Sequence, residues 1–319
     1  MKNFWQELKK SKKGQPILAL APLAGFTDSA FRLLCREYGA DVVYSEMASV
    51  SALNYNPTKT LELIKFDKKE RPYIVQIFGS NKDHFIKAVK IIEKEIKPDG
   101  IDINFGCPVN KVLKQGAGSK LMSDLKLSRE IIEAVLQNTK LPLSIKVRTE
   151  AFSVDLIKFL QNISDLPVSA LMIHGRTLKQ LFSGPIDLEV IKKSRNYFSG
   201  IILANGGINN LDEAVEIMDK TGVDGIGFGR GALGQPWIFS KDWQNISGEN
   251  RKKIAIEVVL RHLKLTRENR GEISFSEFKG HLAWYLKDFA GASELRSKIM
   301  LCKNYLDIEN ILKNKKVLV

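Results

Sequence analysis

The sequence predicts an α/β protein, a (β/α)8 TIM barrel followed by an all-helical domain. Eight short apolar runs, closed by glycine, proline or polar residues, recur through the first 240 residues. Such runs are typical of buried parallel strands. Amphipathic stretches separate most of them, and beyond about residue 245 only helical patterns remain. We therefore divide the chain into a catalytic barrel, residues 1–240, and a helical domain, residues 241–319.

The strand-like runs have the number and spacing of a barrel. They lie at residues 17–25, 41–47, 73–79, 100–108, 141–148, 170–176, 200–207 and 223–230. Helical patterns between them include 84–96 and 128–138, the second with Ser128 as its expected N-cap. Eight strand–helix units in about 225 residues fit the barrel. A doubly wound open sheet is the alternative, but the first run leads into APLAGFTD and not into the GxGxxG turn of that fold.

The helical domain carries the denser positive charge. We expect helices over 251–269, 276–289 and 294–314. Residues 245–319 hold 15 Lys+Arg and 9 Asp+Glu, a net +6 of the chain's +13. This excess is compatible with an anionic partner such as RNA. A solvated, lysine-rich surface explains it equally well.

Composition excludes several classes of protein. With 44% hydrophobic and 27% charged residues among 319, the chain is neither disordered nor collagenous. Its three cysteines form no CxxC pair and no histidine–acid cluster has metal spacing, so we expect no disulfide framework and no metal. We read no signal peptide and no run of about 20 apolar residues, and so expect a cytoplasmic protein without a membrane span.

Chemistry in such barrels lies at the carboxyl ends of the strands. Every predicted strand here ends in polar or glycine residues, which indicates an active-site rim. The candidates are Pro22, Leu23, Ala24, Gln76, Asn104, Cys107, Lys146, His174, Arg176, Asn205, Gly206, Gly207, Gly229 and Arg230.

Two glycine-rich turns, ANGGI and GFGRGALG, follow the seventh and eighth strands. Loops at these positions form the phosphate site of many barrels, where backbone N–H groups face the anion. Glycine allows that close approach, and Arg230 could add charge. The alternative is a pair of tight turns that need glycine only for their own geometry.

Four side chains at the rim suggest chemistry. Lys146 ends an apolar strand and needs an anionic or electron-rich partner such as a reduced flavin; Schiff-base chemistry or a solvent-facing lysine are the alternatives. Cys107 could act as a nucleophile or proton donor, whereas Cys35 and Cys302 lie in helical patterns and are expected to be inert. His174 and Arg176 fit a phosphate or an oxygen-rich ring. The other histidines, His84, His262 and His281, are expected at the surface or in packing.

A series of motifs resembles one family. APLAGFTD, SEM, QIFGS, DINFGCPVNKV with GAGSKLM, IKVR, HGRT, NGGI and GRGALGQPWIF occur in this order, as in tRNA-dihydrouridine synthases. GALGQPWIF and FKGHLAWYLKDFAGASELR resemble the bacterial B-type branch. The resemblance extends from about residue 17 to 300.

The resemblance implies an FMN enzyme in which NADPH reduces the flavin and the flavin passes hydride to C6 of a tRNA uracil. Cys107 would give a proton to C5. Pro22, Leu23 and Ala24 would approach the flavin through backbone, and Gln76 and Lys146 would hold the ring. Asn205, Gly206, Gly207, Gly229 and Arg230 would take the phosphate, His174 would lie near flavin and substrate, and Asn104 and Arg176 would lie at the uracil.

Two other functions fit parts of the pattern. An FMN barrel that acts on a free pyrimidine explains the phosphate turns and Lys146, but not the basic tail with Trp284 and Tyr285. A non-catalytic RNA-binding protein explains the tail, but not Cys107, Lys146 and Gln76. The sequence leaves open which uridine is reduced, whether NADPH or NADH is used, and whether Lys120, Lys313, Lys315 or Lys316 touches RNA. We expect a monomer.

Overall fold

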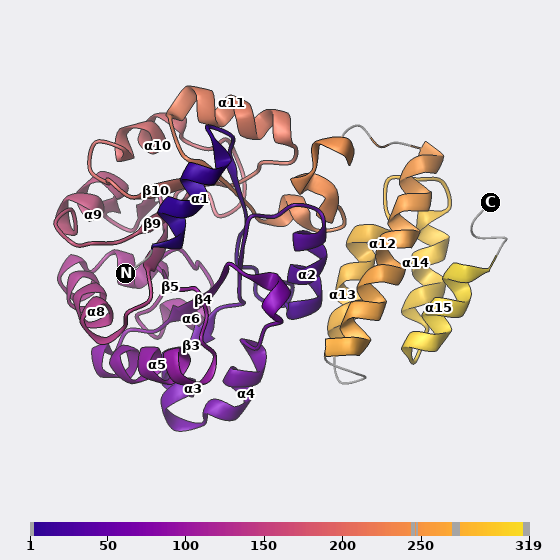
Figure 1. Ribbon diagram of the computed structural model, residues 1–319, viewed down its shortest axis with the longest axis horizontal. Coiled ribbons are helices and arrows are strands. Elements are labelled where there is room, and N and C mark those ends of the chain that lie inside the picture. The colour runs from indigo at the N-terminus through magenta and orange to yellow at the C-terminus, as the bar shows by residue number, and fades with distance from the viewer. Residues whose placement is uncertain (1–2, 244–245, 247, 270–274, 315–319) are drawn as a thin grey trace.

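The computed structural model describes residues 3–243, 246, 248–269 and 275–314 (Figure 1). Eight parallel strands pair in a closed ring, because β1 pairs with both β2 and β11, and β2 also pairs with β4. The barrel strands are β1 (Ile17–Leu20), β2 (Val42–Tyr44), β4 (Tyr73–Phe78), β5 (Gly100–Asn104), β6 (Leu143–Arg148), β9 (Ala170–His174), β10 (Ile201–Asn205) and β11 (Gly225–Phe228). The predicted (β/α)8 barrel is therefore confirmed.

Helices surround the ring of strands (Figure 1). They are α1 (Phe4–Lys12), α2 (Ser29–Glu37), α3 (Val50–Tyr55), α4 (Pro57–Leu63), α5 (Lys82–Glu95), α6 (Asn110–Leu113), α7 (Ser119–Met122), α8 (Leu125–Asn138), α9 (Leu156–Asn162), α10 (Leu188–Ser194) and α11 (Leu211–Thr221). Short strands β3 (Ala48–Ser49), β7 (Glu150–Ala151) and β8 (Val154–Asp155) lie in the loops, with the 3-10 turns η1 (Lys68–Glu70), η2 (Arg230–Ala232), η3 (Pro236–Phe239) and η4 (Lys241–Trp243).

The alternation of side chains along the strands decides which of them enter the barrel. Met172 and Leu203 belong to the apolar cluster inside the barrel, where the buried Trp5 of α1 packs with them. His174 and Asn205 lie two positions further along the same strands. They point to the same side because side chains alternate with a period of two. The same geometry brings the polar strand ends together at the carboxyl end of the barrel.

The C-terminal helices form a separate bundle beside the barrel, next to α2 (Figure 1). They are α12 (Gly248–Asn269), α13 (Phe275–Tyr285), α14 (Ala292–Met300) and α15 (Tyr305–Lys313). Gly234 allows the barrel to approach α13 closely, since a Cβ there would lie 2.0 Å from the carbonyl oxygen of Trp284. Arg251 also donates to the Gly234 carbonyl at 3.1 Å. The two parts therefore share a tightly packed interface.

Two predicted details are wrong. Asp124, not Ser128, caps α8: its carboxylate accepts from the Leu127 N–H at 3.0 Å, while the buried Ser128 hydroxyl donates to the Leu121 carbonyl at 2.7 Å. The helix expected over 294–314 is two helices, because the chain turns after Met300 and Asn304 caps α15 through the Asp307 N–H. The period of the apolar residues continues across that turn and conceals it in the sequence.

Among the described helices, none is both long and apolar enough to cross a membrane.

Candidate active site

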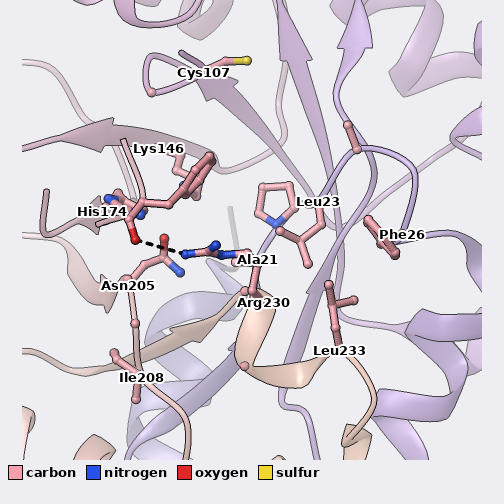
Figure 2. A pocket seen from close by; sticks show the side chains of 18 of the residues that line it. Ala21, Leu23, Phe26, Cys107, Lys146, His174, Asn205, Ile208, Arg230 and Leu233 are labelled. Atoms are coloured by element: carbon pink, nitrogen blue, oxygen red, sulfur yellow. Dashed lines mark hydrogen bonds between the residues drawn. The ribbon is translucent and has the colours of Figure 1, made fainter. Parts of the chain in front are cut away.

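A pocket of about 500 Å³ opens at the carboxyl end of the barrel (Figure 2). All but one of the predicted site residues line it: Pro22, Leu23, Ala24, Gln76, Asn104, Cys107, Lys146, His174, Asn205, Gly206, Gly207, Gly229 and Arg230. Their register explains this convergence, since Asn104 pairs with Lys146 and His174 pairs with both Arg148 and Asn205. In Figure 2, Cys107 lies across the pocket from Asn205 and Ile208.

One end of the pocket consists of the two glycine turns. Gly206 and Gly207 have φ values of 119° and 68°, in the region that favours glycine. Asn205 joins this turn to the neighbouring strand, because its Nδ2 donates to the Gly227 carbonyl at 2.6 Å. Gly229 leads into η2, and the exposed Arg230 donates to the Phe182 carbonyl at 3.3 Å (Figure 2). This end combines free backbone with positive charge, as an anion requires.

Arg176 is the predicted residue that does not line the pocket. Its Nε donates to the Gly184 carbonyl at 2.7 Å, which holds the guanidinium behind the first glycine turn, at Gly206 and Gly207. A Cβ at Gly207 would lie 2.6 Å from Arg176 Nη2. Arg176 Nη1 is buried and has no hydrogen-bond partner among the described residues. The structure therefore brings Arg176 to the glycine turns, and gives its predicted place at the substrate no support.

Lys146 and His174 form the floor of the pocket. Lys146 has neither a hydrogen bond nor an ion pair within the described chain. Burial, with Arg148 nearby, lowers the pKa of Lys146 to about 8. The backbone N–H of Arg176 donates to His174 Nδ1, with the two nitrogens 3.3 Å apart. Nδ1 is therefore the acceptor, and Nε2 carries the ring hydrogen. Burial and the surrounding cations hold the pKa of His174 far below its usual value. The floor thus offers one ammonium and one neutral N–H donor.

A chain of hydrogen bonds, the mouth network of Asp102, Gln76 and Asn104, leads from the barrel interior to Cys107. Buried Asp102 accepts from Gln76 Nε2 at 2.7 Å, and Gln76 Oε1 accepts from Asn104 Nδ2 at 2.9 Å. Asn104 Oδ1 then accepts from the backbone N–H of Cys107 at 2.9 Å. Because a carboxylate only accepts, Asp102 determines the orientation of both amides. Gln76 and Asn104 are among the residues predicted from the sequence, whereas Asp102 is not, although it precedes Asn104 by two positions on the same strand face.

The mouth network and the start of α7, at Gly118 and Ser119, both hold the Cys107 turn. A Cβ at Gly118 would lie 2.8 Å from the Cys107 carbonyl oxygen, and the Ser119 N–H donates to that oxygen at 3.1 Å. Burial raises the pKa of the Cys107 thiol above its usual value. The neighbouring cations Lys146 and Arg148 oppose this rise but do not cancel it. The thiol therefore keeps its proton at neutral pH. Cys35 is buried in α2, whereas Cys302 is buried in the turn between α14 and α15 and not in a helix as predicted; burial raises the pKa of each.

Other residues at the pocket were not selected from the sequence. Arg148 donates to the carbonyl oxygens of Gly106 at 2.8 Å and Thr177 at 3.0 Å, and so joins two of the loops that surround the pocket. Phe182 packs under the guanidinium of Arg230, 4.6 Å from ring centroid to Cζ. A hydrophobic loop residue near a ligand site has no signal in the sequence pattern, whereas Arg148 stood at a strand end and could have been found.

The helical domain also reaches the pocket. Trp284 and Lys287 of the segment around α13 line it, and the Lys287 ammonium lies 5.3 Å from the Trp284 ring centroid. Tyr285 does not, because it is buried and pairs with His262. Lys120 lies 4.7 Å from the Phe152 ring, and Lys313 pairs with Glu309. Lys315 and Lys316 lie outside the described residues.

Comparison with known proteins agrees with this geometry. Residues 19–317 match the family model "Dihydrouridine synthase (Dus)". A "Probable tRNA-dihydrouridine synthase" of Aquifex aeolicus (strain VF5) is 34% identical, over 92% of this chain and 93% of its own. "tRNA-dihydrouridine synthase B" of Pseudomonas aeruginosa is 34% identical over 88% of this chain and 87% of its own.

Solved structures support the fold. A histamine dehydrogenase from Rhizobium sp. 4-9 aligns with a TM-score of 0.55 at 12% identity, over 77% of this chain and 49% of its own. An old yellow enzyme homologue from Zymomonas mobilis aligns with a TM-score of 0.50 at 14% identity, over 69% of this chain and 86% of its own. With sequence, pocket and barrel in agreement, this chain belongs to the dihydrouridine synthase family of enzymes.

Proposed function

We propose that this protein binds FMN and uses NADPH to reduce specific uridines in tRNA to 5,6-dihydrouridine. One pocket carries the proposal: it has two glycine turns at one end, a protonated thiol on the opposite side, and on its floor an ammonium without a partner in the described part of the chain. The names of the relatives given above and the flavin-type barrel of the old yellow enzyme homologue support the same activity.

The residues present fit FMN. Gly206, Gly207, Gly229 and Arg230 would take the phosphate. Arg176 Nη1, which has no hydrogen-bond partner among the described residues, would supply a further donor from behind the turn. Asn205 would hold the turn in place. Lys146 and His174 would face the ring's electron-rich oxygen and nitrogen edge, Gln76 would contact it at the end of the mouth network, and Pro22, Leu23 and Ala24 would pass along it through backbone.

When bound and reduced by NADPH, FMN would supply the hydride that adds to C6 of the uracil. Cys107 would give its thiol proton to C5, and solvent would return a proton to the thiolate. Asn104, with its amide oriented by Gln76, would hold the base beside Cys107. An extruded uridine is needed, because a base stacked inside folded tRNA cannot reach this pocket.

tRNA is the proposed partner because the helical domain, which carries the denser positive charge, reaches the pocket through Trp284 and Lys287. An aromatic ring beside a cation suits an unstacked base and its phosphate. We infer that the protein acts as a monomer in the cytoplasm, where tRNA is modified, and that it needs no metal for the reaction itself.

Replacing Cys107 tests the chemistry. Cys107→Ala should retain FMN and NADPH oxidation, while dihydrouridine formation falls roughly 100-fold or more, as expected for a lost general acid. Cys302→Ala, in the helical domain, is the matched control. Dihydrouridine is measured by mass spectrometry of tRNA from a strain that lacks the gene. Equal loss of NADPH oxidation and uridine reduction in Cys107→Ala would mean that the cysteine is structural.

A further inference from the structure

A second group of buried polar side chains lies where the barrel meets the helical domain. Asp28 caps α2 of the barrel, while His262 belongs to α12 and His281 to α13. Both histidines are fully buried and Asp28 is 7% exposed. One ligand atom of each residue lies within 4.8 Å of those of the other two. We call these three residues the interdomain cluster.

Hydrogen bonds on the outer side of the cluster orient two of its members. Asp28 Oδ1 accepts from the Phe31 N–H at 3.1 Å, which leaves Oδ2 for the cluster. His262 Nδ1 pairs with the Tyr285 hydroxyl at 2.9 Å, which leaves Nε2. Histidine and carboxylate ligands of metal ions typically have such a partner on the atom that does not bind the metal.

Three histidine nitrogens of the cluster have no hydrogen-bond partner among the described residues. His262 Nε2 and both ring nitrogens of His281 are buried without a hydrogen-bond partner in the described part of the chain. Unsatisfied buried polar atoms are costly, and they are rare in folded proteins. Burial, with His281 nearby, lowers the pKa of His262 to about 3, so that this ring is neutral, as metal binding requires.

The spacing suits a small cation. Asp28 Oδ2 and His281 Nε2 are 3.4 Å apart, too far for a good hydrogen bond. Two ligands at about 2.0–2.1 Å from a tetrahedral zinc ion are separated by about 3.4 Å. Two imidazole nitrogens and one carboxylate oxygen form a donor set that suits zinc and similar ions.

We propose that Asp28, His262 and His281 form a binding site for a zinc-type divalent metal ion that ties the helical domain to the barrel. The ion would take water as its fourth ligand and would satisfy His262 Nε2 and His281 Nε2. Its role would be structural, because it lies outside the pocket of the reaction. This inference does not depend on the proposed function.

The test uses full-length protein without a histidine tag, stripped with EDTA and titrated with ZnCl2. Bound zinc is counted by elemental analysis after desalting, and thermal unfolding is followed by circular dichroism. Asp28→Asn keeps an oxygen that can cap α2 but removes the charge. His281→Gln is the second variant, and His84→Gln, on α5 and hydrogen-bonded to Ser51, is the matched control.

We expect one zinc per chain in the wild type and in His84→Gln, and affinity at least about tenfold weaker in both cluster variants. Zinc should raise the unfolding temperature of the wild type and of His84→Gln only. Absence of zinc binding in the wild type would overturn the proposal, as would equal binding by all four proteins. Loss of stability in both cluster variants without any zinc bound by the wild type would identify the Asp28–His281 contact as the stabilising interaction and overturn the proposal.

Discussion

The barrel mouth and the interdomain cluster both bury polar groups, but they satisfy them differently. In the mouth, Asp102, Gln76 and Asn104 exchange hydrogen bonds of 2.7–2.9 Å, and the free groups face an open pocket. In the cluster, the inner nitrogens of His262 and His281 have no hydrogen-bond partner within the described residues, and apolar and aromatic side chains enclose them.

This difference separates function from stability. Groups that face a pocket act on a ligand, so their loss should change binding or rate while the fold persists. Groups enclosed between two domains act on the fold, so their loss should change unfolding while the pocket persists. Variants in the mouth can sharpen this comparison, or contradict it if they unfold the protein.

The largest effect is expected at the glycine turns. A Cβ at Gly229 would make only ordinary contacts, the nearest at 3.6 Å, so Gly229→Val should fold. Its side chain would occupy the proposed phosphate site and abolish FMN retention. Gly206→Val should also lose FMN, with additional strain because φ is 119°. The purified variants should be colourless but folded by circular dichroism. A yellow Gly229→Val protein would show that the FMN phosphate binds elsewhere.

The next effect concerns the charge of Lys146 and depends on pH. The ammonium is present below a pKa of about 8 and is lost above it. FMN affinity of the apoprotein should therefore be constant below pH 8 and then fall by up to about tenfold per pH unit. Lys146→Met should bind weakly at every pH, whereas Lys146→Arg should bind without the fall. Fluorescence titration of FMN measures both, and an unchanged pH profile in Lys146→Met would exclude this lysine.

A smaller effect is expected from the mouth network. Asp102→Ala would leave Gln76 Nε2 without its acceptor and free the amides to rotate, and dihydrouridine formation should fall by about tenfold, the effect of one unsatisfied buried donor. Asp102→Asn restores an acceptor and should remain within about twofold. Burial raises the pKa of Asp102 to about 6, so a rate change near pH 6 that Asp102→Asn removes would show that its charge, and not its orientation of Gln76, matters.

Gly118 and Gly222 allow a matched comparison. Both have positive φ, 61° and 69°, but a Cβ at Gly118 would meet Cys107, whereas one at Gly222 would meet nothing within 4 Å. Gly222→Ala should lose about 1–2 kcal/mol of stability through left-handed backbone strain. Gly118→Ala should lose more, because its ψ of −129° lies outside the left-handed region and its Cβ would clash with the Cys107 carbonyl oxygen. Only Gly118→Ala should slow uridine reduction, several-fold, with flavin reduction by NADPH unchanged. Similar kinetics for the two variants would show that the Cys107 turn tolerates displacement.

The smallest effect is expected from single lysines. Lys287 lines the pocket, while Lys313 pairs with Glu309 on the far helix. Lys287→Ala should lower the salt dependence of tRNA affinity by about one unit of log–log slope, and Lys313→Ala by almost none. Filter binding over a range of salt measures the slopes. These substitutions each remove one charge and leave the fold intact. Deletion of residues 241–319 would also expose the apolar face of α2 and remove Trp284 from the pocket.

The barrel, its strand order and most of its pocket could be predicted from the amino-acid pattern alone. This was possible because a parallel barrel brings every carboxyl strand end to one rim, so that a local pattern carries global information. Gln76, Asn104, Lys146, His174 and the glycine turns could therefore be assigned to one site without any knowledge of contacts. Asp102 was within reach of the same rule, since it shares a strand face with Asn104.

Features that depend on contacts between distant segments could not be predicted in this way. Asp28 lies more than 230 residues from His262, and no periodicity relates the two. Arg176 stands at a strand end like the other site residues, but its hydrogen bond to Gly184 turns it behind the glycine turn. Packing between elements sets both outcomes, because the direction of a long side chain and the meeting of two domains depend on neighbours that the local sequence does not specify.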